Sequence, residues 1–182
     1  MPGLLEGKVA LITGGGSGIG RATALKSAQE GASVMIADYV QEGGERTVRM
    51  IKDAGGMTSF VHTDVSAAKQ VEAMVAKTLE TYGRLDCAFN NAGIEGTFVH
   101  GTVECSEENF DRTIAINLKG VWLCMKYEIP QMLKQGGGTI VNTASVAGLV
   151  GGPVAPAYHA SKHGVVGLTR TPLSNMPRRI FA

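Results

Sequence analysis

The sequence predicts a doubly wound α/β fold, in which helices cover both faces of a parallel sheet. Short apolar, β-branched runs alternate with longer helical patterns along the 182 residues. Alternation at this spacing implies right-handed crossovers and therefore parallel strands. A glycine-rich turn follows the first short run, and polar residues follow several others, as expected where an open α/β sheet binds a ligand. Without an internal repeat or linker, residues 1–182 are expected to form one domain.

The first half of the chain supplies three expected strands. Lys8–Thr13 (KVALIT) and Ser33–Ala37 (SVMIA) are apolar runs typical of buried strands. A helix from about Gly18 to Glu30 connects them. The polar segment Gln41–Ala54 is expected to form the next helix, and Thr58–His62 the third strand.

The second half supplies two more strands and three helices. Helical spacing of apolar residues predicts a helix over Ala67–Tyr82, and Leu85–Asn90 (LDCAFN) follows as the fourth strand. After a loop, one long helix is expected from about Glu107 to Gln135, and Pro130 is expected to bend it. The fifth strand is Gly138–Thr143 (GTIVNT), and the last helix is Tyr158–Arg170.

The composition excludes several classes of function. The net charge is +1, and no basic stripe indicates a nucleic-acid partner. No apolar stretch is long enough to cross a bilayer, and the N-terminus does not resemble a signal peptide. The three cysteines lack metal-site or disulfide spacing, and the four histidines show no metal-ligand spacing. We therefore expect a cytoplasmic protein without a metal or a membrane partner.

The glycine-rich turn Thr13–Gly20 (TGGGSGIG) predicts a dinucleotide site. Glycines in such a turn allow a tight bend, a close approach of the backbone to a pyrophosphate, and close packing of the helix on the strand. The N–H groups at the start of the helix favour the phosphates. The cofactor-binding residues expected in this turn are Gly14, Ser17, Gly18, Ile19 and Gly20.

Asp38, at the end of the second strand, is expected to bind the adenosine ribose through its carboxylate. The same carboxylate repels a 2′-phosphate, and the nearby positions 15, 16, 17 and 39 carry no Arg or Lys. This pattern favours NAD over NADP. The alternative is that Asp38 is a solvated loop residue.

Two further polar segments follow the third and fourth strands. Asp64 and Val65 come after the third strand, and Asn91, Ala92 and Gly93 come after the fourth. Both segments fall at carboxyl ends of strands, where open α/β sheets bind ligands. Each segment alone is also explained by local turn chemistry. Their joint placement favours contact with the cofactor.

Tyr158 and Lys162 are four residues apart and therefore share one face of the last helix. An unperturbed tyrosine, with a pKa of about 10, is a poor base at neutral pH. A nearby ammonium favours the phenolate, which can accept a proton from an alcohol. Ser145 follows the fifth strand, where its hydroxyl can bind the substrate oxygen. Without the glycine turn upstream, this Tyr/Lys pair would be interpreted as an amphipathic surface pair.

Together these motifs resemble the short-chain dehydrogenase/reductase family over residues 8–171. They are TGGGSGIG at 13–20, Asp64, NNAG at 90–93, Asn117 within INLKG, Ser145, and YHASK at 158–162. The resemblance implies a Rossmann fold and hydride transfer between NAD and a small-molecule alcohol or ketone. It implies that Tyr158 is the catalytic acid/base, that Lys162 assists it and binds the nicotinamide ribose, and that Ser145 holds the reacting oxygen. It also implies that Asn117 anchors a water in a proton relay, and that the protein is a homodimer or homotetramer.

The resemblance ends after Thr171. Members of the family continue with further strands and a substrate-covering loop, whereas residues 172–182 form an atypical tail with two prolines. We therefore expect a C-terminally truncated Rossmann fold. Two hypotheses follow, namely a working NAD-dependent oxidoreductase, or a nucleotide-binding remnant with weak or no activity. A nucleotide-sugar epimerase or a methyltransferase fits NNAG and YHASK less well.

Overall fold

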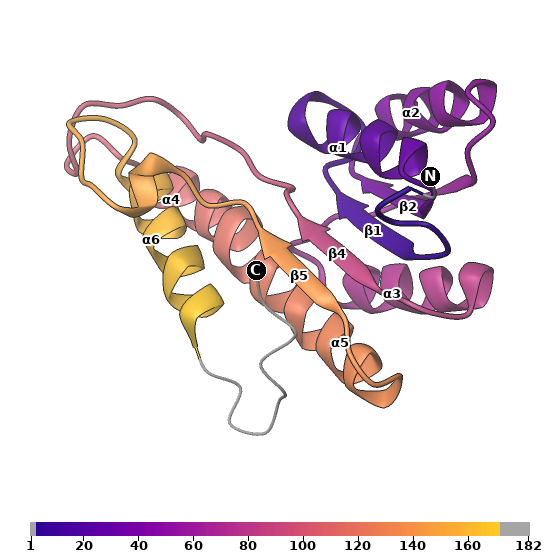
Figure 1. Cartoon of the computed structure of the whole chain (residues 1–182). Helices are drawn as coiled ribbons and strands as arrows, with labels where there is room; N and C mark the ends of the chain where they lie inside the picture. Colours follow the sequence, from indigo (N-terminus) through magenta and orange to yellow (C-terminus); the bar gives the residue numbers. More distant parts are fainter. Residues whose placement is uncertain (1–2, 172–182) are drawn as a thin grey trace.

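A computed structural model describes residues 3–171. Figure 1 shows an open sheet of parallel strands, with helices packed on its two faces. The strand order is β3-β2-β1-β4-β5, so β1 lies at the centre and pairs with both β2 and β4. The predicted doubly wound parallel sheet is therefore confirmed. Because all strands run in one direction, their carboxyl ends meet at a single edge.

The five strands match the five predicted apolar runs. The third strand has the predicted bounds, and the others shift by one or two residues at an end. The bounds are Val9–Thr13 for β1, Ser33–Asp38 for β2, Thr58–His62 for β3, Cys87–Asn90 for β4 and Thr139–Asn142 for β5. In the pairing of β1 with β2, Thr13 lies opposite Ala37, and this register brings the glycine turn and Asp38 to the same edge of the sheet.

The core divides between the two faces of the sheet because successive strand residues point to opposite sides. Ala10 and Ile12 of β1 pack with α1 and α2 on one face, whereas Leu11 packs with α3, α5 and α6 on the other. These helices span Gly18–Gln29 for α1, Gln41–Asp53 for α2, Ala68–Tyr82 for α3, Gly120–Lys134 for α5 and Pro156–Arg170 for α6. Within residues 3–171, no helix combines the length and apolar character needed to cross a membrane.

The long helix expected over Glu107–Gln135 differs from the prediction in one respect. It consists of α4 (Glu107–Ile114), a π-helical segment η1 (Ala115–Lys119) and α5. The departure from α geometry therefore surrounds Asn117, whereas α5 continues as one helix through Pro130. Single π turns inside α-helices occur frequently at functional sites.

The last helix also starts earlier than predicted. It begins at Pro156 rather than Tyr158, because proline suits the first turn of a helix, where its missing N–H costs nothing. Ala155, directly before it, adopts a left-handed conformation with φ of 53°. A short 3-10 helix, η2 (Val146–Gly148), follows β5. The tail 172–182, which was expected to be atypical, lies outside the described residues.

Candidate functional site

The glycine turn brings the end of β1 into contact with the start of α1. Gly14 adopts a left-handed conformation with φ of 65°. A Cβ at Gly20 would overlap the carbonyl oxygen of Gly14 and lie 2.8 Å from Nδ2 of Asn91. Glycine at position 20 therefore lets the helix, the turn and the segment after β4 pack together.

Asp38 is held at the end of β2 by two backbone N–H groups. Gly16 N donates to its Oδ2 at 2.8 Å, and Val40 N donates to its Oδ1 at 2.8 Å. The carboxylate is thus oriented toward the glycine turn. Arg21, the basic residue closest in sequence to the turn, donates to Gly16 O, and its Nε donates to Thr47 Oγ1 at 3.0 Å.

The segment after β4 is attached to β1 by a buried hydroxyl. Thr13 Oγ1 accepts from Asn91 N at 3.0 Å and from Ala92 N at 3.1 Å. Asn91 Nδ2 donates back to Thr13 O at 3.2 Å. Sequence reasoning missed this function of Thr13. Its place as the last residue of a buried strand, directly before the glycines, was the signal that could have revealed it.

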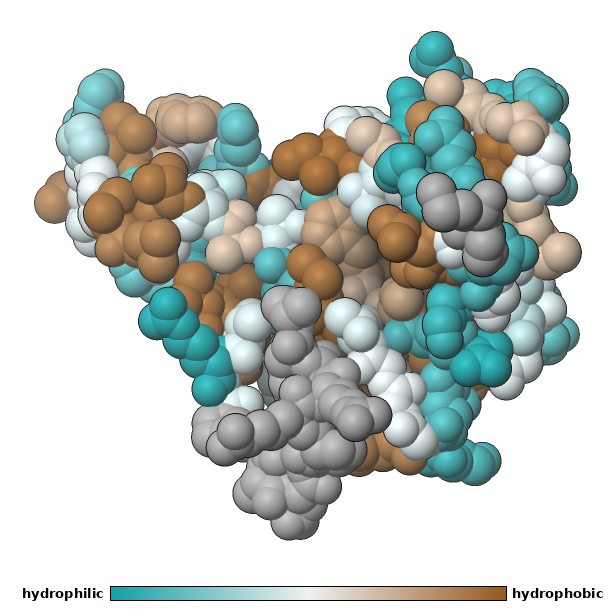
Figure 2. Space-filling model, in the orientation of Figure 1, coloured by the Kyte–Doolittle hydropathy of each residue, from teal (hydrophilic) through white to brown (hydrophobic). Residues whose placement is uncertain are grey.

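A cleft of about 920 Å³ runs along this edge of the sheet. Figure 2 shows the surface hollowed between α1 and the loop that leads from β4 to α4. Ten of the residues predicted to bind cofactor line this cleft. They are Gly14, Ser17, Gly18, Ile19, Asp38, Asp64, Val65, Asn91, Ala92 and Gly93. The other three, Gly20, Tyr158 and Lys162, do not line the cleft, and Gly20 packs beneath the turn.

Other cleft-lining residues were not predicted. Tyr39 is 68% exposed, and its ring centroid lies 5.6 Å from that of His62 in a tilted arrangement. Ile94, Arg112 and Ile116 line the same cleft from the far side. Tyr39, Ile94 and Arg112 lie in none of the recognised motifs, and Ile116 lies in INLKG without having been predicted to contact a ligand, so the fold was needed to place them at this edge.

Asn117 connects the cleft to α6. Its Oδ1 accepts from Ile94 N at 2.8 Å, and its Nδ2 donates to Ile94 O at 2.7 Å and to Ser161 Oγ at 3.2 Å. Ser161 Oγ in turn donates to the carbonyl of Tyr158 at 2.7 Å. The buried Asn117 side chain therefore fixes the loop after Gly93 relative to the helix that carries Tyr158. Ser161, which sequence reasoning did not single out, is part of this link.

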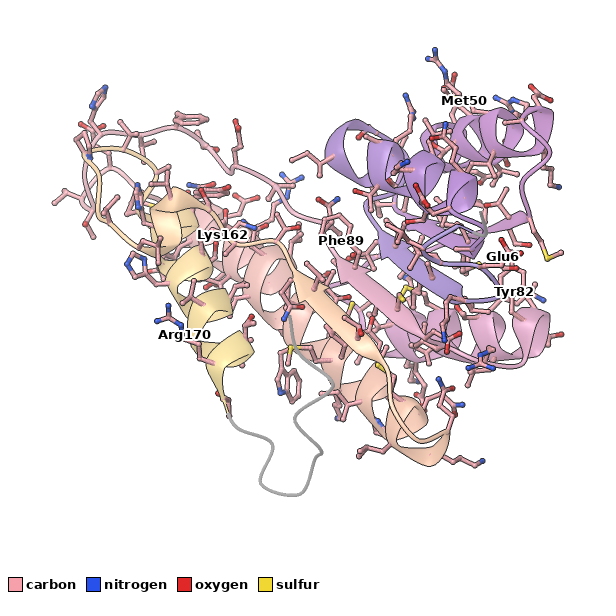
Figure 3. The ribbon with its side chains drawn as sticks, viewed as in Figure 1. Glu6, Met50, Tyr82, Phe89, Lys162 and Arg170 are labelled. Atoms are coloured by element: carbon pink, nitrogen blue, oxygen red, sulfur yellow. The ribbon has the colours of Figure 1, made fainter. Side chains whose placement is uncertain are left out.

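Tyr158 and Lys162 lie together on α6, as their spacing predicts. Lys162 Nζ is 5.6 Å from the centroid of the Tyr158 ring and donates to Thr143 O at 2.7 Å. Figure 3 labels Lys162, which extends from α6 toward the segment after β5. Burial lowers the pKa of Lys162 from its ordinary value. The hydrogen bond to Thr143 O thus holds the Lys162 ammonium beside the Tyr158 ring.

Ser145 is placed by a close contact between η2 and α6. It precedes η2, and its Oγ accepts from Ala147 N at 3.2 Å. Gly148 packs so tightly on α6 that a Cβ there would lie 2.7 Å from Lys162 O. Ser145, Tyr158 and Lys162 do not line the large cleft, nor does Asn117. The four residues predicted to be catalytic therefore lie outside its lining, on η1, directly before η2 and on α6. Across residues 3–171, no cluster of His, Cys, Asp or Glu side chains is suited to hold a metal ion.

The fold and this cleft are of the Rossmann type, and comparison with known proteins gives the family. The family model described as short chain dehydrogenase matches residues 8–179. The chain therefore belongs to the short chain dehydrogenase family. A solved short chain dehydrogenase/reductase from Burkholderia phymatum, in complex with NAD, superposes with a TM-score of 0.88 at 42% identity. That match covers 91% of this chain and 58% of the other.

Three curated relatives are similar over nearly the whole chain. An uncharacterized oxidoreductase of Thermotoga maritima is 51% identical, with 91% of this chain and 64% of the relative covered. A cyclohexanol dehydrogenase of Acinetobacter is 45% identical, and the match covers 93% of this chain and 67% of that relative. A 2,5-dichloro-2,5-cyclohexadiene-1,4-diol dehydrogenase of Sphingobium indicum is 47% identical, covering 91% and 65%. The chain thus spans about two thirds of the length of these relatives.

Proposed function

We propose that the protein is an NAD-dependent oxidoreductase that transfers a hydride between the cofactor and an alcohol or ketone. The observation that carries this proposal is the Tyr158–Lys162 pair, whose helix is linked through Ser161 and Asn117 to Ile94 in the lining of the dinucleotide-type cleft. The NAD-bound relative from Burkholderia phymatum supports the choice of cofactor.

The residues present fit a dinucleotide. Gly18 adopts φ of 48° with open space where a Cβ would stand, so its backbone is accessible to a pyrophosphate at the start of α1. Asp38 would bind the adenosine ribose, and Asp64, Val65 and Asn91–Gly93 would line the path of the cofactor. Lys162 would bind the nicotinamide ribose. NAD supplies the hydride acceptor when it is bound, and NADH the hydride donor.

The chain's own residues handle the proton. In oxidation, the phenolate oxygen of Tyr158 accepts the hydroxyl proton of the alcohol while the carbon loses hydride. In reduction, the phenol donates that proton to the carbonyl oxygen. The Lys162 ammonium stabilises the phenolate, and Ser145 Oγ hydrogen-bonds the reacting oxygen. Asn117, whose side chain holds Ile94 and Ser161, would anchor the water of the proton relay from within η1.

A cyclic secondary alcohol is the substrate class we propose. The names of the cyclohexanol and cyclohexadiene-diol dehydrogenases support it. Apolar side chains also gather near Ser145, where Val146 and Leu149 are exposed on one loop and Phe98 on another. An isolated antiparallel β-bridge between His100 and Val154 joins the two segments. Figure 2 shows apolar (brown) surface on this part of the molecule, at the left of the view.

The test has two stages. NADH binding is titrated first by fluorescence, and the absorbance of the reduced cofactor is then followed with cyclohexanol, cyclohexanone and open-chain analogues. We expect binding and turnover, with the cyclic substrates preferred. Binding without turnover would overturn the enzymatic function and favour the nucleotide-binding remnant.

Asp38→Asn is expected to reduce the preference for NAD over NADP. The substitution removes the negative charge that repels a 2′-phosphate and keeps one side-chain oxygen, which can accept from Gly16 N or from Val40 N but not from both. We expect the ratio of NADP to NAD dissociation constants to fall about tenfold, which corresponds to ~1.4 kcal/mol. The measurement is fluorescence titration with both reduced cofactors. Tighter binding of NADP than of NAD by the unchanged protein would contradict the assignment of Asp38.

We further propose that the protein is a cytoplasmic homodimer or homotetramer. The exposed apolar residues Phe110 on α4 and Trp122 on α5 support association through the α4–α5 surface. The free thiols of Cys87, Cys105 and Cys124 fit a reducing compartment. Light scattering after size-exclusion chromatography tests the assembly, and a monomer at micromolar concentration would contradict it.

A further inference from the structure

A buried carboxyl group lies under the catalytic edge of the sheet. Glu128, on α5, has no exposed surface. Its Oε2 accepts from Asn90 Nδ2 at 3.0 Å, but its Oε1 has no hydrogen-bond partner among residues 3–171. Burying an ionised carboxylate with an unpaired oxygen is costly, so this arrangement needs an explanation.

Asn90, the last residue of β4, also has a buried side-chain oxygen without a hydrogen-bond partner among residues 3–171. Its Nδ2 donates to Glu128 Oε2 and also to Asn142 Oδ1 at 3.0 Å, so both amide hydrogens are used. Its Oδ1 has no partner. Within residues 3–171, three buried side-chain oxygens are unpaired in this way, and two of them belong to this one hydrogen-bonded pair.

We propose that Glu128 is a neutral carboxylic acid in the native protein and that its Oε1–H donates to Asn90 Oδ1. One proton then satisfies both orphaned oxygens. A primary amide presents a C=O and an N–H on the same side, and a carboxylic acid presents a C=O and an O–H in the same way. The two groups therefore pair through two hydrogen bonds. The second amide hydrogen of Asn90 points away from the pair, toward Asn142, as such an arrangement requires.

The surroundings of Glu128 favour the neutral form. Burial raises the pKa of Glu128 from 4.5 to about 7, and the hydrogen bond from Asn90 offsets this only in part. The groups that reach the cluster from β4, β5 and α6 are the uncharged Asn90, Asn142 and Thr169. Cys124, one turn earlier on α5, is the titratable neighbour. The pKa of the Cys124 thiol is raised, mainly by burial and to a lesser extent by the charge of Glu128.

The pair makes Glu128 a positioning residue for the catalytic edge. Asn90 links it to Asn142 on β5, and Asn142 Nδ2 donates to Thr169 Oγ1 of α6 at 3.0 Å. The next residue after Asn90 lines the cofactor cleft, and the next after Asn142 is Thr143, which accepts the hydrogen bond from Lys162. The protonated pair therefore holds the ends of β4 and β5 in register beneath the site.

Glu128→Gln tests the proposal because an amide reproduces the neutral acid. The glutamine Nε2 donates to Asn90 Oδ1, and its Oε1 accepts from Asn90 Nδ2. In the native protein, the folded state binds more protons than the unfolded state between pH 4.5 and about 7, so stability falls as pH rises through this window. We expect the urea midpoint of the wild type to drop, relative to that of E128Q, as the pH rises from 4.5 to about 7. Glu72→Gln, at an exposed position of α3, should follow the wild type.

Two further measurements keep the proposal falsifiable. Infrared spectra near neutral pH should show the C=O band of a neutral carboxyl group in the wild type and in E72Q, but not in E128Q. Glu128→Leu, which leaves the Asn90 amide unpaired, should lower the urea midpoint and weaken NADH binding, whereas E128Q should preserve both. A missing infrared band, or a pH-independent difference between the wild type and E128Q, would overturn the proposal. The infrared and urea measurements need neither cofactor nor substrate, so their outcome is independent of the proposed function.

Discussion

Tyr158→Phe is expected to abolish turnover while leaving NADH binding nearly unchanged. The substitution removes the one oxygen that we propose to exchange a proton with the substrate, but it keeps the ring 5.6 Å from Lys162 Nζ. Positioned acid–base groups typically contribute about 10²–10⁴ in rate, and we expect kcat to fall by at least the lower figure. The measurement is kcat with the best cyclic alcohol found, beside a fluorescence titration of NADH.

Tyr127→Phe provides the matched control. Tyr127 lies on α5, where Lys126 Nζ stands 5.5 Å from its ring, and it does not line the cofactor cleft. Tyr127 is half-buried against the core, and loss of its hydroxyl alone keeps the packing of the ring, so this change should leave kcat within about twofold. A wild-type kcat in Tyr158→Phe would refute the acid/base assignment and leave the hydride-transfer reaction to be explained by another group.

Gly20→Ala is expected to weaken NADH binding at least tenfold and to destabilise the fold. The new Cβ would overlap the carbonyl oxygen of Gly14 and press on Asn91 Nδ2. The clashing oxygen belongs to the backbone of the turn and cannot rotate away as a side chain could. The clash is therefore relieved only if α1 moves away from β1. Overpacking of this kind costs about 1–3 kcal/mol. Urea unfolding measures the loss of stability, and fluorescence titration measures the loss of binding.

Gly167→Ala is the control for this substitution. Gly167 lies within α6 and no atom stands within 4 Å of its would-be Cβ. Replacing a glycine by alanine inside a helix stabilises it by roughly 0.5–1 kcal/mol. If Gly20→Ala matched the wild type in stability and NADH affinity, the close contact of the turn with α1 would have no functional importance.

The fold and the cofactor cleft were largely predictable because each depends on local signals. Apolar runs mark the strands, and Gly14, Asp38 and Asn91 each follow directly after one. Parallel pairing alone then brings such residues to one edge. The rest depends on tertiary contacts. Periodicity does not reveal the π segment around Asn117, because a single π turn spans too few residues for a change of period to be recognised in the apolar pattern.

Two contacts of the site could not be predicted from the types of residue in the sequence. Glu128 would be assigned to a solvated helix face, because glutamate is almost never fully buried unless it is paired. Its partner, Asn90, stands in the recognisable NNAG motif, but nothing in that motif indicates a carboxyl group from another helix. Lys162 was predicted as the partner of Tyr158, yet its hydrogen bond to Thr143 O depends on how α6 packs against the end of β5.

The central position of β1 has a kinetic consequence. β1 pairs with β2, its neighbour in sequence, and with β4, which the chain reaches only after the three connections through α1, α2 and α3. The chain loses the entropy of closing this long loop before the contacts between β1 and β4 can form. Pairing of β1 with β4 is therefore expected to be the slow event in folding. Asn91 and Ala92, which follow β4, can line the cofactor cleft only after β4 has paired with β1. NADH should therefore slow unfolding while leaving the refolding rate unchanged, which stopped-flow measurements with and without the cofactor would show.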